Sequence, residues 1–242
     1  MTYEAWIGMR YLAAKKEPFL AVINFIAIAG VAIGVAALIV VIAVMTGFDN
    51  DLRDKIVGTN AHLVVEKEIG INNFREVQKD ILSVKGVQAT TPYVQGPLFL
   101  EYDGQSRGVM GRGIDPTTEA NVTKTKEYLK QGSLEALDQN GIIIGSELSI
   151  YLGKHLGDTV TVIAPALGIA GGGWRHELKI VGIFSSGMYD YDMNLILINL
   201  VKAQEIYRLP SDTVGGIAVK LKNIYDAPAI KKTLYKTLGY SF

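Results

Sequence analysis

The sequence predicts an α+β protein made of one N-terminal transmembrane helix followed by a mixed α+β domain with two lobes. Three observations predict this class. A long uncharged apolar run lies near the start of the chain, short strand-like and helix-like segments alternate after it, and turn signals join several strands as hairpins. The mean hydropathy of +0.23 is high for a soluble protein, as a concentrated apolar segment would make it.

The apolar run extends from Pro18 to Phe48 and contains no charged residue. A bilayer core of about 30 Å is crossed by roughly 20 helical residues, so this run is long enough to span it. It also exceeds the apolar stretch of roughly 7–15 residues found in cleaved signal peptides. We therefore expect residues 18–48 to form a transmembrane helix surrounded by membrane lipid.

The segments on either side of the run predict two further elements. Aromatic residues between Tyr3 and Tyr11 recur at helical spacing, so residues 1–17 are expected to form a cytoplasmic, interfacial helix, with a disordered tail as the alternative. Residues 49–58 continue a helical stripe and predict a stalk that prolongs the span. Because the tail before the span is short and basic, we expect a cytoplasmic N-terminus and a periplasmic main domain, although basic residues flank both ends.

Small residues within the span predict a helix-packing face. Gly30 and Gly34 form a GxxxG pattern, and Ala27 lies on the same side one turn earlier. Small residues at this spacing let two membrane helices approach closely. The alternative is that they occur by chance on a lipid-facing helix, because such residues are common in membrane spans.

Alternating segments after residue 58 predict the mixed domain. Strands are expected near 61–66, 87–93, 97–102, 106–112, 142–144, 159–164, 177–184, 195–198 and 214–221. Helices are expected to begin at cap residues Asn73, Ser146, Asn199 and Asp226. Asp103-Gly104 predicts a tight hairpin turn, and the glycine-rich segment 165–174 joins two strands as an extended hairpin.

No long linker divides this region, so residues 59–242 are expected to form one periplasmic domain with two lobes. Residues 59–115 and 195–242 both have strand–helix–strand character and are assigned to one lobe. Residues 116–194 are assigned to an inserted lobe between them.

The composition excludes several classes of function. Lysine plus arginine and aspartate plus glutamate both number 24, so no basic excess indicates nucleic-acid binding. The chain has no cysteine, which rules out disulfides, a thiolate nucleophile and cysteine-based metal sites.

Motifs for catalysis are also missing from the sequence. His62, His155 and His176 are scattered without zinc-ligand spacing, and no Walker A motif surrounds the Gly153-Lys154 pair. Asp190-Tyr-Asp192 resembles a cation ligand pair but lacks further ligands, so a polar turn is preferred. We therefore expect a non-catalytic protein with no cofactor and no metal.

Several stretches together carry a resemblance to a known family. They are Met9–Leu12, Ile26–Val41, Val44–Phe48 with Leu52-Arg53 and Ile56–Gly58, then Thr91–Tyr93, Gly113–Pro116, Gly157-Asp158, Val181–Asp192 and Ala203-Gln204. In this order and spacing the chain resembles the LolC/LolE family of lipoprotein-releasing ABC transporter permeases, in the wider group that includes MacB.

The resemblance implies a MacB-like periplasmic core domain and a set of partners. It implies a cell inner membrane permease that pairs with a second permease copy or paralogue and with a separate LolD-like ABC ATPase. The implied complex extracts lipoproteins and passes them to a periplasmic LolA-like carrier. Such permeases continue into three more membrane helices, so this sequence is expected to be an N-terminal portion of one.

The resemblance also implies two binding regions. The segment 165–174 lies where the family has a carrier-recruiting hairpin called the Hook, so Pro165, Leu167, Ile169 and Trp174 are expected to bind the carrier. An apolar prong on a glycine-rich tip suits a lipid carrier's groove, and a loop with no partner is the alternative. At the outer end of the span, Val44, Met45 and Phe48 are expected to contact the acyl chains of the lipoprotein.

Two other interpretations remain open at this point. One keeps the architecture and makes the protein a MacB-like exporter of other cargo or an FtsX-like regulator of a periplasmic hydrolase. The other is a single-span anchored scaffold domain with no ATPase.

Overall fold

A computed structural model describes residues 3–13, 18–59, 61–164 and 174–239 of the chain. It divides into two compact units, one ending at Asp54 and one beginning at Lys55.

The first unit consists of two helices, α1 (Tyr3–Ala13) and α2 (Pro18–Thr59). In α1 the guanidinium of Arg10 lies 5.5 Å from the centre of the Trp6 ring, one turn away on the same side. The 42-residue α2 runs unbroken through residues 49–58. Its segment Val22–Asp49 has a mean hydropathy of 3.0 and is not buried, and it is the one helix in the described chain that is long and apolar enough to cross a membrane.

Two features adapt α2 to an apolar environment. The Thr46 hydroxyl donates to the carbonyl of Ile42 at 2.8 Å, so this polar group is satisfied within the helix. The side chains along the segment are apolar all round, which suits lipid rather than one-sided packing on a soluble core. The predicted N-terminal apolar helix is therefore confirmed as a candidate span.

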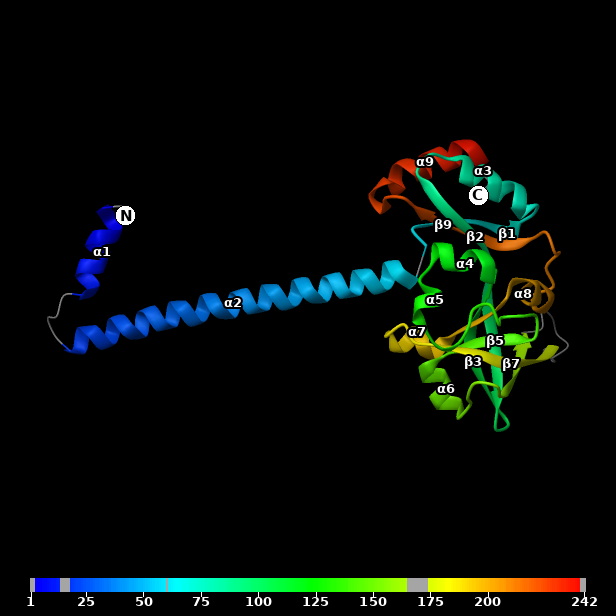
Figure 1. Cartoon of the computed structure of the whole chain (residues 1–242), viewed down its shortest axis with the longest axis horizontal. Coiled ribbons are helices and arrows are strands. Elements are labelled where there is room, and N and C mark those ends of the chain that lie inside the picture. Colours follow the sequence, from blue (N-terminus) through cyan, green and yellow to red (C-terminus); the bar gives the residue numbers. More distant parts are fainter. Residues whose placement is uncertain (1–2, 14–17, 60, 165–173, 240–242) are drawn as a thin grey trace. The chain divides into compact units, whose positions relative to one another are not determined.

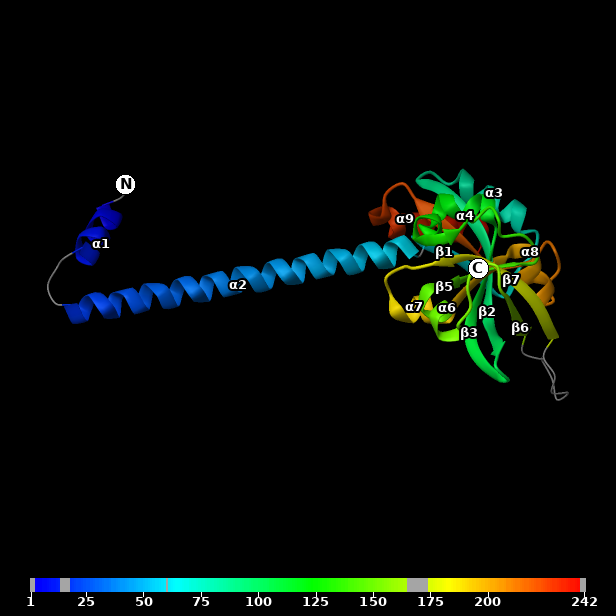
Figure 2. The ribbon, with the colours of Figure 1, turned by 60° about the horizontal axis from the view of Figure 1, so that its bottom comes forward.

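The second unit is built on one nine-stranded sheet with helices on it (Figures 1 and 2). Its strands are β1 (Leu63–Ile71), β2 (Val87–Tyr102), β3 (Gln105–Ile114), β4 (Leu129–Gly132), β5 (Gly141–Gly145), β6 (Thr159–Ala164), β7 (Trp174–Phe184), β8 (Leu195–Asn199) and β9 (Val214–Leu221). Its helices are α3 (Phe74–Ser83), α4 (Pro116–Val122), α5 (Thr125–Tyr128), α6 (Ser146–Leu152), α7 (Tyr189–Asn194), α8 (Leu200–Ile206) and α9 (Ala227–Leu238), with a 3₁₀ turn at Ile224–Asp226.

Six of the strands close into a barrel. Pairing runs from β2 to β3, β8, β5, β7 and β6, and β6 returns to β2 through the register Phe99↔Ile163 to Glu101↔Thr161. Where a barrel strand pairs with a neighbour on each side, it has no open edge. The β3–β8 and β5–β7 pairs are parallel and the others are antiparallel, so the predicted mixed α+β class is confirmed.

Alternation along the strands fills the barrel. Inward positions carry large aliphatic residues that belong to one buried cluster: Leu98, Leu100, Val109, Ile142, Ile144, Val160, Val162, Leu178, Ile180, Ile196 and Ile198. Neighbouring residues such as Ile143 and Leu197 face outward and pack in a second cluster with Phe184, Leu134 and Leu137. The period of two thus gives each buried strand two apolar faces.

One end of the barrel is closed by α8. Its Ala203 and its following residue Tyr207 press on the inward side of β2 and β3, where a Cβ on Gly113 would lie 2.1 Å from the Ala203 Cβ. The Tyr207 hydroxyl donates to the Gly96 carbonyl at 2.7 Å. Glycine is required here because a short helix must approach two strands closely.

The remaining strands extend the sheet beyond the barrel. β9 pairs with the first half of β2, and β1 pairs with β9, so β1 is a terminal strand. Helices α3 and α9 lie together over this extension (Figure 1). The predicted stripe on α3 is confirmed, because Phe74, Ile81 and Val84 are buried and Val77 packs against the same cluster.

Some sequence predictions are corrected by the structure. The two strands expected at 87–93 and 97–102 are one strand, β2, because Gly96-Pro97 is not a turn. Gly96 makes room for the Tyr207 ring. Pro97 pairs only with Met110 of β3, so no strand on the other edge of β2 needs the N–H that Pro97 lacks. β4 was not predicted at all.

The side-chain cap predictions for three helices are also wrong. Asn73 precedes α3 but has φ of 50°, and its side chain does not cap the helix. Its carbonyl instead accepts from the Glu76 N–H at 2.9 Å. Asp226 makes no side-chain cap, because a 3₁₀ turn capped by Asn223 leads into α9. Gly145, not Ser146, stands in the cap position of α6. Asn199 does cap α8: its Oδ1 accepts from the Val201 N–H at 3.0 Å, and its Nδ2 donates to the Leu137 carbonyl at 3.1 Å.

The sheet runs through both of the lobes proposed from sequence. β8, assigned to the first lobe, pairs with β3 on one side and with β5 of the inserted lobe on the other. The boundary between the lobes therefore stays a prediction, whereas the continuity of the sheet is a structural fact.

Gly145→Ala is expected to destabilise the second unit strongly. A Cβ at Gly145 would lie 1.9 Å from the backbone oxygen of Asp192, and overpacking of this kind costs about 1–3 kcal/mol. Urea unfolding of the full chain in detergent would measure the change. The matched control is Gly215→Ala, whose Cβ would meet backbone only at an ordinary 3.5 Å. Equal midpoints for the two variants would contradict the expectation.

Candidate functional site

The predicted extended hairpin is present as the antiparallel pair β6–β7. Its register runs from Thr159↔Lys179 to Ala164↔Trp174. The tip residues Pro165, Leu167 and Ile169 lie outside the described part of the chain. The structure therefore describes the base of the hairpin, and Trp174 is the one predicted carrier-binding residue that it places.

Trp174 is the first residue of β7 and is 58% exposed. The guanidinium of Arg208 lies 4.3 Å from the centre of its ring. Arg208 follows α8 in the left-handed region, with φ of 56°, and its N–H donates to the Glu205 carbonyl at 3.1 Å. A cation–π contact at such a site contributes about 0.5–1 kcal/mol, so α8 helps to orient the indole.

Charged side chains border the hairpin base on both faces. Arg175 of β7 reaches across β6 to Glu101 of β2, with 3.2 Å between Nη2 and Oε2. On the other face, Glu205 of α8 lies 3.0 Å from the Lys202 ammonium and 3.8 Å from His176. Burial, and then the charge of Lys202, lower the pKa of His176. The base is thus tied to β2 and to α8.

The Asp190–Asp192 segment lies within helix α7, and the carboxylate of Asp192 is fully used in hydrogen bonds. Asp192 is buried and accepts from the Ser186 N–H at 2.8 Å, from the Ser186 hydroxyl at 2.7 Å and from the Gly187 N–H at 3.3 Å. These donors hold the loop before α7. The expected polar turn is therefore wrong in form, because the segment is helical. The described residues contain no cluster of three potential metal-ligating side chains.

The histidines of the second unit lie in packing or surface positions. The Nδ1 of His62 accepts from the Leu221 N–H at 3.1 Å and so ties the start of β1 to β9. Burial and the charge of Lys220 lower the pKa of His62. His155 lies 3.9 Å from Asp158 in an exposed turn.

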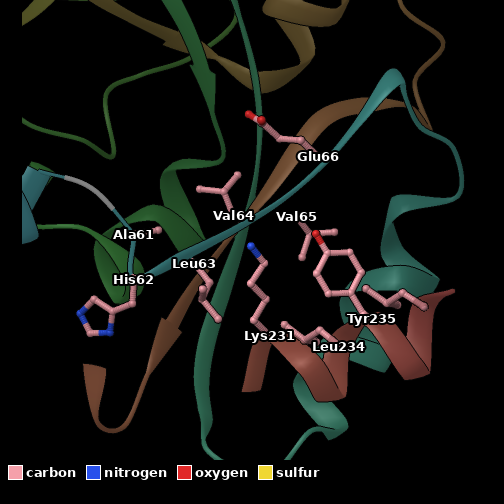
Figure 3. Close-up of a pocket in the computed structure, with 10 residues that line it drawn as sticks. Ala61, His62, Leu63, Val64, Val65, Glu66, Lys231, Leu234 and Tyr235 are labelled. Atoms are coloured by element: carbon pink, nitrogen blue, oxygen red, sulfur yellow. The ribbon is translucent and has the colours of Figure 1, made fainter. Parts of the chain in front are cut away.

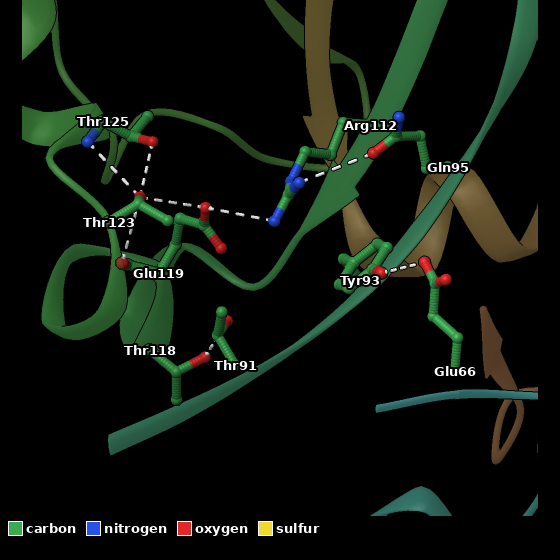
Figure 4. A network of polar contacts seen from close by, with 9 residues as sticks. All are labelled: Glu66, Thr91, Tyr93, Gln95, Arg112, Thr118, Glu119, Thr123 and Thr125. Carbon is green, nitrogen blue, oxygen red and sulfur yellow. Dashed lines mark hydrogen bonds and ion pairs between the residues drawn. The ribbon is translucent and has the colours of Figure 1, made fainter. Parts of the chain in front are cut away.

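A partly buried network of charged and polar side chains was not predicted from the sequence (Figure 4). Its centre is Arg112 of β3, whose guanidinium lies 4.5 Å from the Tyr93 ring centre and 3.9 Å from Glu119 of α4. The Tyr93 hydroxyl donates to Glu66 of β1. The Thr123 hydroxyl donates to Glu119 at 3.0 Å. The network joins three strands to α4, on the outward side of the barrel.

Glu119 is the most deeply buried member of this network. Burial raises the pKa of its carboxyl, and the charge of Arg112 and hydrogen bonds from threonines oppose that rise. Within the described residues, Glu119 Oε2 and Arg112 Nε are buried without a hydrogen-bond partner. An arginine between two glycines at the apolar end of β3 was the available sequence signal, because buried arginines are usually paired.

The residues of α2 that were predicted to pack against helices or to contact acyl chains are exposed. Ala27, Gly30 and Gly34 are exposed, and a Cβ at either glycine would meet nothing within 4 Å. Val44, Met45 and Phe48 are also exposed, at 63–69%. The helix-packing and acyl-contact assignments therefore stay predictions.

An open groove lies between β1 and α9 (Figure 3). The cavity has a volume of about 490 Å³ and is lined by Ala61–Glu66 together with Lys231, Leu234, Tyr235 and Leu238. None of its residues was assigned a role from the sequence.

A candidate membrane-spanning helix followed by a mixed α/β domain, built on a barrel with a covered sheet extension, defines the class of protein. A family model for the MacB-like periplasmic core domain matches residues 24–236, and the chain belongs to this family.

Curated relatives confirm the expected membership of the LolC/LolE permeases. The chain is 37% identical over 96% of its length to a lipoprotein-releasing system transmembrane protein LolC from Neisseria meningitidis serogroup B, and covers 57% of that protein. It is 30% identical over 90% of its length to a protein of the same name from Xylella fastidiosa Temecula1, of which it covers 54%. The chain thus spans about half the length of these relatives.

A solved structure shares the fold. The extracellular domain of the noncanonical ABC-type transporter YknZ from Gram-positive bacteria superposes with a TM-score of 0.50 at 13% identity, covering 73% of this chain and 95% of that chain. At this identity the likeness concerns the fold alone.

Asp192→Asn is expected to lower the free energy of unfolding by about 1.5–3 kcal/mol, because hydrogen bonds to a buried charged acceptor are worth this much. Urea unfolding monitored by near-ultraviolet circular dichroism would measure it. Asp190→Asn is the matched control, since Asp190 is exposed in the same segment. A loss no larger than in the control would show that the carboxylate does not hold the loop.

Glu119→Gln is expected to change how stability depends on pH. Because the pKa of Glu119 is raised in the folded state, the folded protein holds a proton that the unfolded chain loses above about pH 4.3. Stability from this group therefore falls as pH rises from there through the folded pKa. The variant lacks this titration, so its stability relative to the parent should rise with pH in urea titrations between about pH 4 and 8. A constant difference between the two proteins would contradict the raised pKa.

Proposed function

We propose that this chain is the N-terminal portion of a permease subunit of an inner membrane ABC transporter that extracts lipoproteins and passes them to a periplasmic carrier. The observation that carries the proposal is the 37% identity to a LolC protein over 96% of the chain. The family match and the candidate span support the same assignment.

In this proposal the subunit performs no catalysis of its own. A separate LolD-like ATPase supplies the energy, and a second permease copy or paralogue completes the membrane part. The N-terminus is cytoplasmic and residues after the span are periplasmic. A reporter enzyme active only in the periplasm, fused after Gly239, is expected to be active. An inactive fusion, together with activity of a cytoplasm-only reporter at the same position, would reverse the orientation.

The hairpin β6–β7 is the proposed binding site for a LolA-like carrier. Its base is anchored by the Trp174–Arg208 contact and by the Arg175–Glu101 ion pair. An apolar tip on a fixed base is suited to entering a lipid-binding groove, because little conformational freedom is lost on binding. Val44, Met45 and Phe48 are proposed to contact acyl chains, and Ala27, Gly30 and Gly34 to pack against other membrane helices.

The combined change Leu167→Ser and Trp174→Ser is expected to abolish capture of a LolA-like carrier by the detergent-solubilised protein. Removal of two apolar anchors from an interface centre typically costs several kcal/mol. Tyr189→Ser is the matched control, because Tyr189 is 62% exposed and lies in α7, away from the hairpin. Undiminished capture by the double variant, with folding intact, would refute the hairpin assignment.

A photoreactive residue at Met45 tests the acyl-chain assignment. Crosslinking to the lipid part of a lipoprotein is expected there, because the side chain is 69% exposed on the span. The same probe at Phe25, which is 72% exposed nearer the other end, is the control. Crosslinking of equal yield at both positions would show no preference for the outer end.

A further inference from the structure

The groove between β1 and α9 exposes the edge of a strand. β1 is the terminal strand of the sheet and, in the described chain, pairs with β9 alone. The register Leu63↔Val219 to Glu66↔Gly216 is antiparallel, so alternate residues of β1 turn their N–H and C=O groups away from β9. Such groups are able to pair with another extended chain.

The lining shows that the groove includes this edge. Six consecutive residues, Ala61–Glu66, line the cavity. Successive side chains of a strand point to opposite faces, so a cavity lying on one face alone would be lined by alternate residues. Figure 3 shows Leu63 and Lys231 on one side of the β1 ribbon and Val64 and Glu66 on the other.

The helix side of the groove supplies apolar surface and a positive charge. Leu234, Leu238 and the ring of Tyr235 offer apolar contact, and Lys231 projects toward β1 (Figure 3). Lys220 lies close enough to His62 to lower the pKa of that side chain. The one acidic lining residue, Glu66, is engaged by the Tyr93 hydroxyl on the far face.

We propose that the groove between β1 and α9 binds an acidic, extended peptide, which adds to β1 as a further strand and packs alternate apolar side chains against α9. Main-chain hydrogen bonds to the β1 edge would give affinity, and the α9 side would select side chains. An acyl chain fits the same volume poorly, because it would bury the edge N–H and C=O groups without partners.

This inference goes beyond the proposed function. It concerns a surface formed by β1 and α9, whereas the proposed carrier site is on β6, β7 and α8. Loss of one activity therefore need not affect the other.

Three synthetic peptides test the proposal with the full chain in detergent. The first alternates valine and glutamate over eight residues, the second replaces glutamate by lysine, and the third is the first with alternate backbone nitrogens methylated. Saturable fluorescence-anisotropy binding is expected for the first alone and should weaken with added salt. Equal binding of the lysine or the methylated peptide, or no binding of the first, would overturn the proposal.

Variants of α9 locate the site. Lys231→Glu should weaken binding of the acidic peptide about tenfold, as expected for loss of a charge-assisted contact. Lys236→Glu is the matched control, because it makes the same charge change on the same helix outside the groove lining. Hydrogen exchange should show peptide-dependent protection at residues 63–66. Equal weakening by both variants, or protection confined to other strands, would overturn the assignment.

Discussion

Closure of the barrel depends on one short strand that pairs along both edges. β6 joins β7 over six residue pairs but joins β2 over only three, Phe99–Glu101 with Thr161–Ile163. Without this contact the sheet would be open, and the inward aliphatic residues of β2 and β7 would lose their opposite wall. The ion pair between Arg175 and Glu101 spans the same closure from the two neighbouring strands.

Much of this fold could be predicted because its signals are local. The bounds of β6 and β9 match the sequence prediction, and Asp103-Gly104 forms the expected turn, both residues having positive φ. The failures have tertiary causes. Gly96-Pro97 suggests a break by local rules, yet it continues a strand because Tyr207, far along the chain, packs on the glycine. Asn73 has a good cap side chain, but its backbone adopts φ of 50° and its carbonyl, not its side chain, accepts from the Glu76 N–H.

The candidate site divides in the same way. The hairpin could be predicted because a glycine-rich segment between two strands is continuous in sequence, and the family resemblance gave it a role. The Arg112–Glu119 network could not, because its members come from β1, β2, β3 and α4 and meet only in the folded chain. The groove beside β1 depends likewise on which strand is terminal, and strand order is not encoded locally.

The glycines beneath α8 have a mechanical consequence. The seven-residue α8 and the following Tyr207 pack closely against Gly96, Gly111 and Gly113. Arg208, just beyond them, stacks on Trp174. A sideways force on the base of the β6–β7 hairpin would therefore press α8 against the barrel strands rather than bend the chain at a hinge. Since packed interiors resist compression, the described base of the hairpin and the barrel should move as one body.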